Sequence, residues 1–240
     1  AEAKDMGAQL IVSHHPLTFE GLKSVTDGDA TARKFVAIIE GGMSAICMHT
    51  NLDAAQGGVN DALAAALGAS LGRMVGELTV GKPKYAANEP RLRELIAEAQ
   101  SLRERLLTLV DADAEAFLPL AEAYRLPKDA PDRGAVMEKC LADAAAVPME
   151  ILELSCRVIA LQEEFAALGS SLAVSDAGTG AVFAWAAMYG AALNVLANTR
   201  LMADRERAED MNRSVNKLMQ EYRVRADRVY GDIFAKLSDK

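Results

Sequence analysis

The chain has 240 residues, 51% of them hydrophobic, which is enough to bury a core in one large domain or two small ones. Its formal net charge is −8, with four Lys/Arg against eight Asp/Glu in residues 1–70 and 22 against 26 in residues 71–240. This balance argues against nucleic-acid binding by either part, and an anionic ligand would need a local basic pocket. Aromatic residues make up only 5%, which favours close-packed helices over a β-sandwich.

Three cysteines, Cys47, Cys140 and Cys156, are widely spaced and form no CxxC motif. An odd number of isolated cysteines predicts buried thiols in a reducing compartment, so we expect a cytoplasmic protein. The first residues, AEAKDMGAQL, lack the basic start and apolar run of a signal peptide.

The first part of the chain alternates between strand and helix patterns. The run AQLIVSHHP predicts a buried strand followed by a loop, and SAICMHT predicts a second short strand. Between them a helical pattern extends from about Asp29 to Gly41, where two glycines end it. We therefore expect a truncated β-α-β unit over residues 1–56.

From residue 57 to residue 240 the pattern is entirely helical. VNDALAAALGASLGRMVGELTV predicts one helix, and the turn GKPKYAANEP leads into a long helix from about Arg91. Further helices are expected from about Ala135, where Pro148 should kink or break the helix, from Ala177, and from about Glu206 to the end. The sequence thus predicts a mainly α protein with a helical bundle as its larger domain.

The segment AGTGAVFAWAAMYGAALNVLAN, residues 177–198, carries no charge and is long enough to cross a bilayer. Its glycines, asparagines and many alanines make it only weakly apolar. A central bundle helix buried on all sides has the same composition, and we favour that interpretation over a membrane span.

Candidate metal ligands lie where the two predicted strands end. His14, His15 and His49 are all the histidines of the chain, and Asp53 follows the last of them by four positions. Imidazoles with a carboxylate suit zinc, iron or manganese. On spacing alone, histidines on the surface or packed in the core are an equally good interpretation.

The long helix carries a carboxylate in its apolar seam. Leucines and alanines recur at spacings of three and four from Leu92 to Leu109, and the same spacing continues to Asp113. A buried carboxylate must be paired or must have a raised pKa, which would make it a proton donor at neutral pH. Alternatively, the helix bends near Pro119 and Asp113 turns outward.

Other polar groups have both a structural and a functional interpretation. Ser175 or Asp176 would cap the apolar helix, or Asp176 would orient a reacting group beside free backbone N–H groups. The pair Asn194 and Asn198 either cross-links helices or holds a polar ligand.

The turn TVGKPKY brings Lys82, Lys84 and Tyr85 together. This is a weak charge cluster. It is nevertheless the kind of local basic site that an anionic substrate would require on an acidic protein.

The first 68 residues resemble the dinuclear-metal family named for NGG-interacting factor three. The resemblance rests on GAQLIVSHHPLTFEGLKSV and HTNLDAAQGGVNDALAAALG. It implies a hexamer and divalent metal ligands at His14, His15, His49 and Asp53, with Asp53 bridging two metals. The family completes its site with a later HxxxE motif, and no histidine follows His49, so the resemblance implies only a partial site.

From about residue 57 the chain resembles the cyclodeaminase domain of formiminotransferase-cyclodeaminase and its free-standing relatives, the methenyltetrahydrofolate cyclohydrolases. The segments that carry the resemblance, in order, are LGASLGRMVGELTVGKPKYA, LVDADAEAF, YRLPKDAP, AAAVPMEILEL, AVSDAG and GAALNVLAN. It implies an all-helical dimer that binds a tetrahydrofolate derivative and either closes a formimino group to the methenyl bridge or hydrolyses that bridge. The family's leading helix and PTPGGGS-like turn are replaced here by QGGV.

Under this resemblance Asp176 and Asp113 would transfer protons, while Lys82 and Lys84 would hold folate carboxylates. Tyr85, Ser175, Asn194 and Asn198 would complete the substrate site. A folate enzyme, as a homodimer or higher homo-oligomer, is therefore the first hypothesis. The alternatives are a metal-dependent hydrolase or assembly module of the dinuclear family, and an inactive chimeric product joined near residues 53–73.

Overall fold

A computed structural model describes residues 9–13, 18, 25–26, 28, 30–47 and 59–238. The chain divides into two compact units, Ala1–Ala55 and Gln56–Lys240.

The first unit contains the predicted β-α-β motif. Strands β1 (Leu10–Ser13) and β2 (Ser44–Cys47) pair in parallel, with Leu10 opposite Ser44. Helix α2 (Ala30–Glu40) connects them, as a crossover between parallel strands requires. It ends in a tight turn in which Gly42 adopts a φ of 62°, a conformation that glycine tolerates best.

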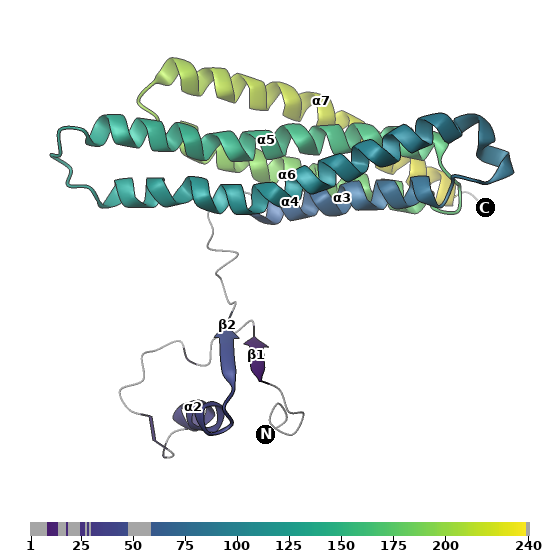
Figure 1. Ribbon diagram of the computed structural model, residues 1–240. Coiled ribbons are helices and arrows are strands. Elements are labelled where there is room, and N and C mark those ends of the chain that lie inside the picture. Colours follow the sequence, from purple (N-terminus) through teal and green to yellow (C-terminus); the bar gives the residue numbers. More distant parts are fainter. Residues whose placement is uncertain are drawn as a thin grey trace. The chain divides into compact units, whose positions relative to one another are not determined.

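The second unit is a bundle of long helices (Figure 1). In chain order it comprises α3 (Val59–Glu77), the short 3₁₀ helix η1 (Pro83–Asn88), α4 (Glu89–Arg125), α5 (Arg133–Leu168), α6 (Val174–Thr199) and α7 (Arg205–Ser238). The mainly α fold class predicted from the sequence is confirmed.

The predicted apolar seam of α4 is buried. Leu92, Leu95, Ala99, Leu106 and Leu109 are all at most 1% exposed, and they pack in the cores that α4 shares with α3, α5 and α6. The same spacing therefore carries Asp113 into the interior.

Pro148 does not break α5, so of the two predicted effects, a kink or a break, the break is wrong. The helix continues from Arg133 to Leu168, and Pro148 is buried inside it. A proline removes one backbone hydrogen bond, but here long packed segments on both sides keep the helix continuous. Pro119 likewise lies inside α4 without ending it.

Helix α6 is the core helix of the bundle. By length and hydropathy it is the one candidate for a membrane span among the described helices. It packs against α3, α5 and α7, and its alanines are buried in two of the core clusters. The prediction of a helix buried on all sides is wrong in part, because Val182, Phe183 and Leu193 are exposed on its outer face.

Glycines allow α3 and α6 to lie very close. A Cβ on Gly68 would come within 2.8 Å of the Gly180 carbonyl oxygen, so neither residue has room for a side chain. Gln162 of α5 is fully buried beside them and donates a hydrogen bond from Nε2 to the Gly68 carbonyl oxygen over 2.8 Å. This contact fixes how α3 lies along α6.

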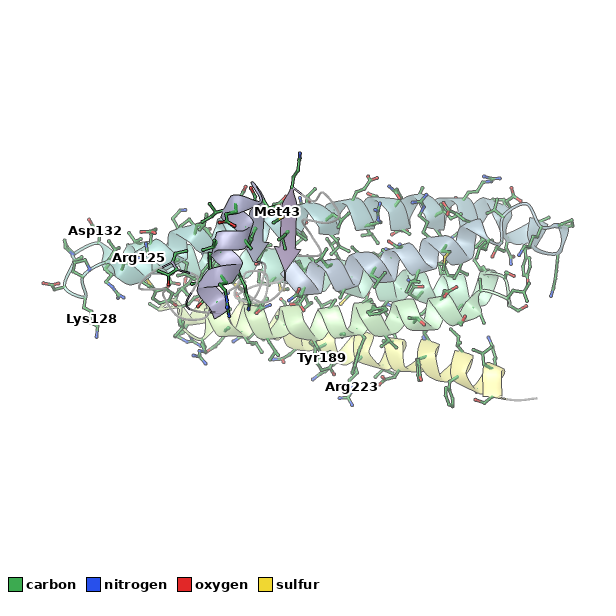
Figure 2. All side chains as sticks on the ribbon, turned by 90° about the horizontal axis from the view of Figure 1, so that it is seen from below. Met43, Arg125, Lys128, Asp132, Tyr189 and Arg223 are labelled. Atoms are coloured by element: carbon green, nitrogen blue, oxygen red, sulfur yellow. The ribbon has the colours of Figure 1, made fainter. Side chains whose placement is uncertain are left out.

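Helix α3 is about half as long as α4 and α5, and these two helices continue past its first residue (Figure 1). The connection between α4 and α5 forms the far end of the bundle, where Figure 2 shows Arg125, Lys128 and Asp132 together. Between that end and the start of α3, the end of α4, the first half of α5 and the end of α6 leave a cleft.

Candidate active site

The cleft beside the start of α3 has a volume of about 870 Å³. We call it the carboxylate cleft. Its lining residues are Asp113, Phe117, Leu120, Ala121, Tyr124 and Arg125 of α4, Ala144 of α5, and Asn194, Ala197, Asn198, Arg200 and Leu201 from the end of α6. It combines an apolar surface with a few polar groups, as ligand sites do.

Asp113 is 4% exposed and lies in this cleft. The alternative that α4 bends near Pro119 and turns Asp113 outward is wrong, because the helix continues and the seam keeps its register. Asp111 and Glu115 on the same helix are exposed, as expected from their different face. The cleft therefore has a carboxylate in its wall.

A second carboxylate, Asp61, lies next to Asn194 at the start of α3. Asn194 donates a hydrogen bond from Nδ2 to Oδ2 of Asp61 over 3.0 Å. Burial raises the pKa of Asp61 to about 6, with a further increase from the charge of Asp113 and an opposing effect from the Asn194 hydrogen bond. A carboxyl group with this pKa can accept and donate protons near neutral pH.

Gly190, one helical turn before Asn194, is needed for this arrangement. A Cβ at residue 190 would lie 1.9 Å from Oδ1 of Asp61. The carboxylate thus occupies the space of an absent side chain, and α6 holds it between Gly190 and Asn194.

Asn198 cross-links two helices. Its Nδ2 donates to the carbonyl oxygens of Ala144, over 3.3 Å, and of Asn194, over 3.0 Å. The helix cross-link predicted from the sequence is confirmed for Asn198. Asn194 and Asn198 also line the carboxylate cleft, and a role in holding a polar ligand stays a prediction.

The other predicted site residues lie at the opposite end of the bundle. Tyr85 of η1 accepts a hydrogen bond at its hydroxyl from the backbone N–H of Ser171, over 3.3 Å, in the turn that precedes α6. Lys84 lies over the ring of the same tyrosine, with Nζ 5.4 Å from its centroid, and Lys82 is exposed. The Ser171 contact lowers the pKa of Tyr85 to about 8.

Asp176 and Ser175 lie at this same end, in the first turn of α6. Asp176 and Asn194 are 18 positions apart in one helix, which is about 27 Å at the helical rise of 1.5 Å per residue. Asp176 and Asp113 of one chain are therefore too far apart to act on the same substrate atom, and the proton-transfer roles that the resemblance implies for them stay predictions. Sequence spacing did not reveal this because the two residues are on different helices.

The predicted cap of α6 is also wrong. The helix begins at Val174 with Ala173 in the cap position, and no side chain caps it. Ser175 is exposed, and Ala173 accepts the backbone hydrogen bond of Asp176 instead.

The predicted metal ligands His14, His15, His49 and Asp53 lie outside the described residues. Among the residues that are described, no group of three or more His, Cys, Asp or Glu side chains is arranged to hold a metal ion. Cys140 and Cys156 are buried free thiols, as expected, and burial raises the pKa of Cys156 to about 12.

Comparison with known proteins shows to which family the helical unit is related. The family model described as formiminotransferase-cyclodeaminase matches residues 49–217. The chain belongs to the formiminotransferase-cyclodeaminase family.

Relatives within this family differ in length. The methenyltetrahydrofolate cyclohydrolase of Methylorubrum extorquens is 33% identical over 186 residues, which cover 76% of this chain and 89% of that protein. The formimidoyltransferase-cyclodeaminase of Mus musculus is 34% identical over 184 residues, 75% of this chain but only 34% of that protein. The chain thus spans nearly all of the first relative and about a third of the second.

The helical fold also agrees with a solved structure. The crystal structure of formiminotetrahydrofolate cyclodeaminase from Thermotoga maritima matches with a TM-score of 0.65 at 22% identity, covering 74% of this chain and 88% of that one. A shorter match of a different kind is to the GTP cyclohydrolase 1 type 2 homolog of Clostridium perfringens, 41% identical over 71 residues, 30% of this chain and 27% of that protein.

Sequence reasoning missed several residues of the carboxylate cleft. Asp61 looked like an ordinary acidic residue in the first turn of a helix, a common position for Asp. Arg125 and Arg200 were not distinguished from other surface arginines. The one available signal was Gly190 beside Asn194, because a glycine inside a helix marks a close approach.

Proposed function

We propose that the protein is a folate one-carbon enzyme, either a formiminotetrahydrofolate cyclodeaminase or a methenyltetrahydrofolate cyclohydrolase. Membership of the formiminotransferase-cyclodeaminase family supports this substrate class. The observation that carries the proposal is Asp61, whose pKa of about 6 and position beside Asp113 and Asn194 suit proton transfer at the carboxylate cleft.

In the cyclodeaminase reaction N10 of the folate attacks the carbon of the formimino group on N5, whose imino nitrogen is protonated and carries the positive charge. Asp61, ionised, accepts the proton that N10 loses and passes it to the former imino nitrogen, which leaves as ammonia when its bond to carbon breaks. The methenyl bridge that remains carries a positive charge. The buried carboxylate of Asp113 stabilises that charge and holds the pKa of Asp61 up.

The cyclohydrolase reaction needs the same group. A water molecule attacks the methenyl carbon and gives one proton to Asp61, which passes it to N5 as the bond from that carbon to N5 breaks. The second proton of the water is released to solvent, which leaves a formyl group on N10. One carboxyl group with a pKa near 6 thus serves both reactions, because each moves a proton between a nucleophile and a leaving nitrogen.

The test is an assay of the purified chain with both substrates. With formiminotetrahydrofolate we expect ammonia release and methenyl absorbance, and with methenyltetrahydrofolate we expect loss of that absorbance above the uncatalysed rate. Asp61→Asn should lower kcat by about 10²-fold or more. Absence of both activities in the folded wild-type protein would rule out the proposal.

Asp111→Asn is the matched control. Asp111 is on the same helix as Asp113 but is exposed, so its carboxylate does not face the cleft. The variant should keep the wild-type kcat. Equal losses in Asp61→Asn and Asp111→Asn would show that the loss is not specific to the carboxylate cleft.

We also propose that the protein is a homodimer. The support is an exposed apolar set on α3 and α6, of Leu63, Leu67, Phe183 and Leu193, which are between 36% and 68% exposed. Leu67→Glu should convert the dimer to a monomer in analytical ultracentrifugation. A wild type that sediments as a monomer at micromolar concentration would contradict this.

For the first unit we propose a partial metal site of the dinuclear-metal family. Three imidazoles and a carboxylate, from His14, His15, His49 and Asp53, form a donor set that suits zinc, iron or manganese. The β-α-β motif and the short match to a differently named protein support a separate origin for this unit. A chimeric chain, with neither site complete, remains the alternative proposal.

Elemental analysis of the purified chain tests the metal site. We expect about one divalent metal per chain in the wild type and its loss in His49→Ala. Metal that persists in that variant, or a metal-free wild type after growth with added zinc, iron and manganese, would contradict the site. Folate activity does not enter this measurement, so the two proposals are tested independently.

A further inference from the structure

The carboxylate cleft is acidic at one end and basic at the other. Asp113 and, through Asn194, Asp61 lie at the end next to α3. Arg125 and Arg200 lie in the lining where α4 and α6 finish. Asp113 and Arg125 are 12 positions apart on α4, or about 18 Å along the helix.

The two arginines are available to a ligand. Arg200 is exposed, and its guanidinium makes no ion pair within the described part of the chain. Arg125, whose side chain is 75% exposed, forms an ion pair with the similarly exposed Glu122 over 2.7 Å. An exposed pair of this kind contributes little to stability, so an incoming carboxylate can replace Glu122 at small cost.

An apolar stretch joins the two ends of the cleft. Phe117 and Tyr124 stand on the same wall of α4 between the carboxylates and the arginines, and Ala197 on α6 lines the opposite wall. Aromatic rings beside small residues provide a flat slot for a planar aromatic group. The order along the cleft is therefore acidic, aromatic and basic.

We propose that Arg125 and Arg200 bind the glutamate carboxylates of the folate and so determine its direction in the cleft. This inference rests on the proposed function. A tetrahydrofolate carries a pterin ring at one end, with the reacting N5 and the neighbouring N10 beside it, an aromatic p-aminobenzoyl group in the middle and the glutamate carboxylates at the other end. That order matches the order of groups in the cleft, with the reacting nitrogens beside Asp61.

The geometry assigns this role to the arginines and not to Lys82 and Lys84. The two lysines lie at the end of the bundle where α6 begins, whereas the arginines lie where α4 and α6 finish. A substrate with its reacting atoms at Asp113 cannot reach the lysines of the same chain. Arginine also matches a carboxylate with two parallel hydrogen bonds.

The experiment compares two substrates that share a ring system. Methenyltetrahydrofolate carries the glutamate, and methenyltetrahydropteroate lacks it. In the double variant Arg125→Gln/Arg200→Gln, we expect the KM for methenyltetrahydrofolate to rise about tenfold or more. Each substitution removes a charged hydrogen bond between the protein and the glutamate carboxylates. The KM for methenyltetrahydropteroate should not change, and kcat should stay near wild type for both.

Two further variants sharpen the test. Arg125→Lys/Arg200→Lys keeps the charges and should recover part of the affinity for methenyltetrahydrofolate alone. Arg223→Gln is the surface control, because Arg223 lies on α7, where Figure 2 shows it with Tyr189 on another side of the bundle. It should leave both KM values unchanged.

Two other sets of results would contradict the role proposed for the arginines. If the double glutamine variant has a wild-type KM for methenyltetrahydrofolate, or an equal increase for both substrates, the arginines do not bind the glutamate, while the enzyme assignment stands. If the folded wild type converts neither these two methenyl substrates nor formiminotetrahydrofolate, the proposed function fails and this inference with it.

Discussion

Gly190 of α6 and Asp61 of α3 fit together at the junction of the two helices, where a Cβ on residue 190 would lie 1.9 Å from Oδ1 of the carboxylate. Asn194 holds the other oxygen over 3.0 Å. The orientation of the proposed proton-transfer group therefore depends on a missing side chain. This relationship gives the first prediction.

Gly190→Ala should lower kcat by about 100-fold, because a displacement of about 1 Å at a reacting group has an effect of this size. Alanine normally stabilises a helix by about 1 kcal/mol relative to glycine. Here the clash with Asp61 should cancel that gain, so Tm should not rise. Steady-state kinetics and thermal unfolding of the same preparation measure both effects.

Gly231→Ala is the control for this substitution. Gly231 lies inside α7, and a Cβ there meets nothing within 4 Å. We expect a slightly higher Tm and an unchanged kcat. An active Gly190→Ala variant with a raised Tm would show that Asp61 is not held in the way described.

Protonation of Asp61 should affect stability as well as activity. The pKa of Asp61 is raised to about 6 in the folded state, so the folded protein binds a proton at this group more tightly than the unfolded chain does. The resulting contribution to the free energy of unfolding is fully present below about pH 4 and is lost as pH rises through about 6. Asp61→Asn removes the charge. The variant should therefore be more stable than wild type by about 1–2 kcal/mol at pH 8. The full pKa shift of Asp61 would correspond to more, but the group is partly exposed and solvent screens its charge.

Urea unfolding at several pH values between 4.5 and 8 checks this prediction. The difference between Asp61→Asn and wild type should shrink steadily towards the acid end. A difference that stays constant with pH would mean that Asp61 titrates normally in the folded protein.

Asp113→Asn should move the pH profile of the enzyme. The charge of Asp113 is one of the causes that raise the pKa of Asp61, so its removal should lower that pKa towards the ordinary range of Asp. If Asp61 acts as the base, the acid limb of kcat/KM lies near pH 6 in wild type and shifts to lower pH in the variant. A limb that does not move, or that moves upward, would argue against coupling between the two carboxylates.

Asp176→Asn should keep near wild-type kcat and KM. In one chain Asp176 is about 27 Å along α6 from Asn194, too far to reach a substrate in the carboxylate cleft. The measurement is the same folate assay, with Asp61→Asn as the inactive reference. A loss of 100-fold in Asp176→Asn would place the reaction at the other end of the bundle.

The sequence by itself determined the helical bundle and the buried face of α4, and it left open whether Asp113 stays on that face or turns outward near Pro119. A spacing of three and four residues depends only on the 3.6-residue repeat of a helix, so the seam from Leu92 to Leu109 predicts which face is buried before any partner helix is known. The β-α-β motif followed for the same reason, from runs of apolar residues separated by a helical pattern.

Only the tertiary structure decided which polar groups share a site. The contact between Asp61 and Asn194 joins residues 133 positions apart, and no periodicity within one helix encodes it. It depends on the glycine contact between Gly68 and Gly180, which sets the position of α3 along α6. The same packing separated Asp176 from Asp113, because the direction and offset of neighbouring helices come from how their side chains interlock and not from the pattern along either one.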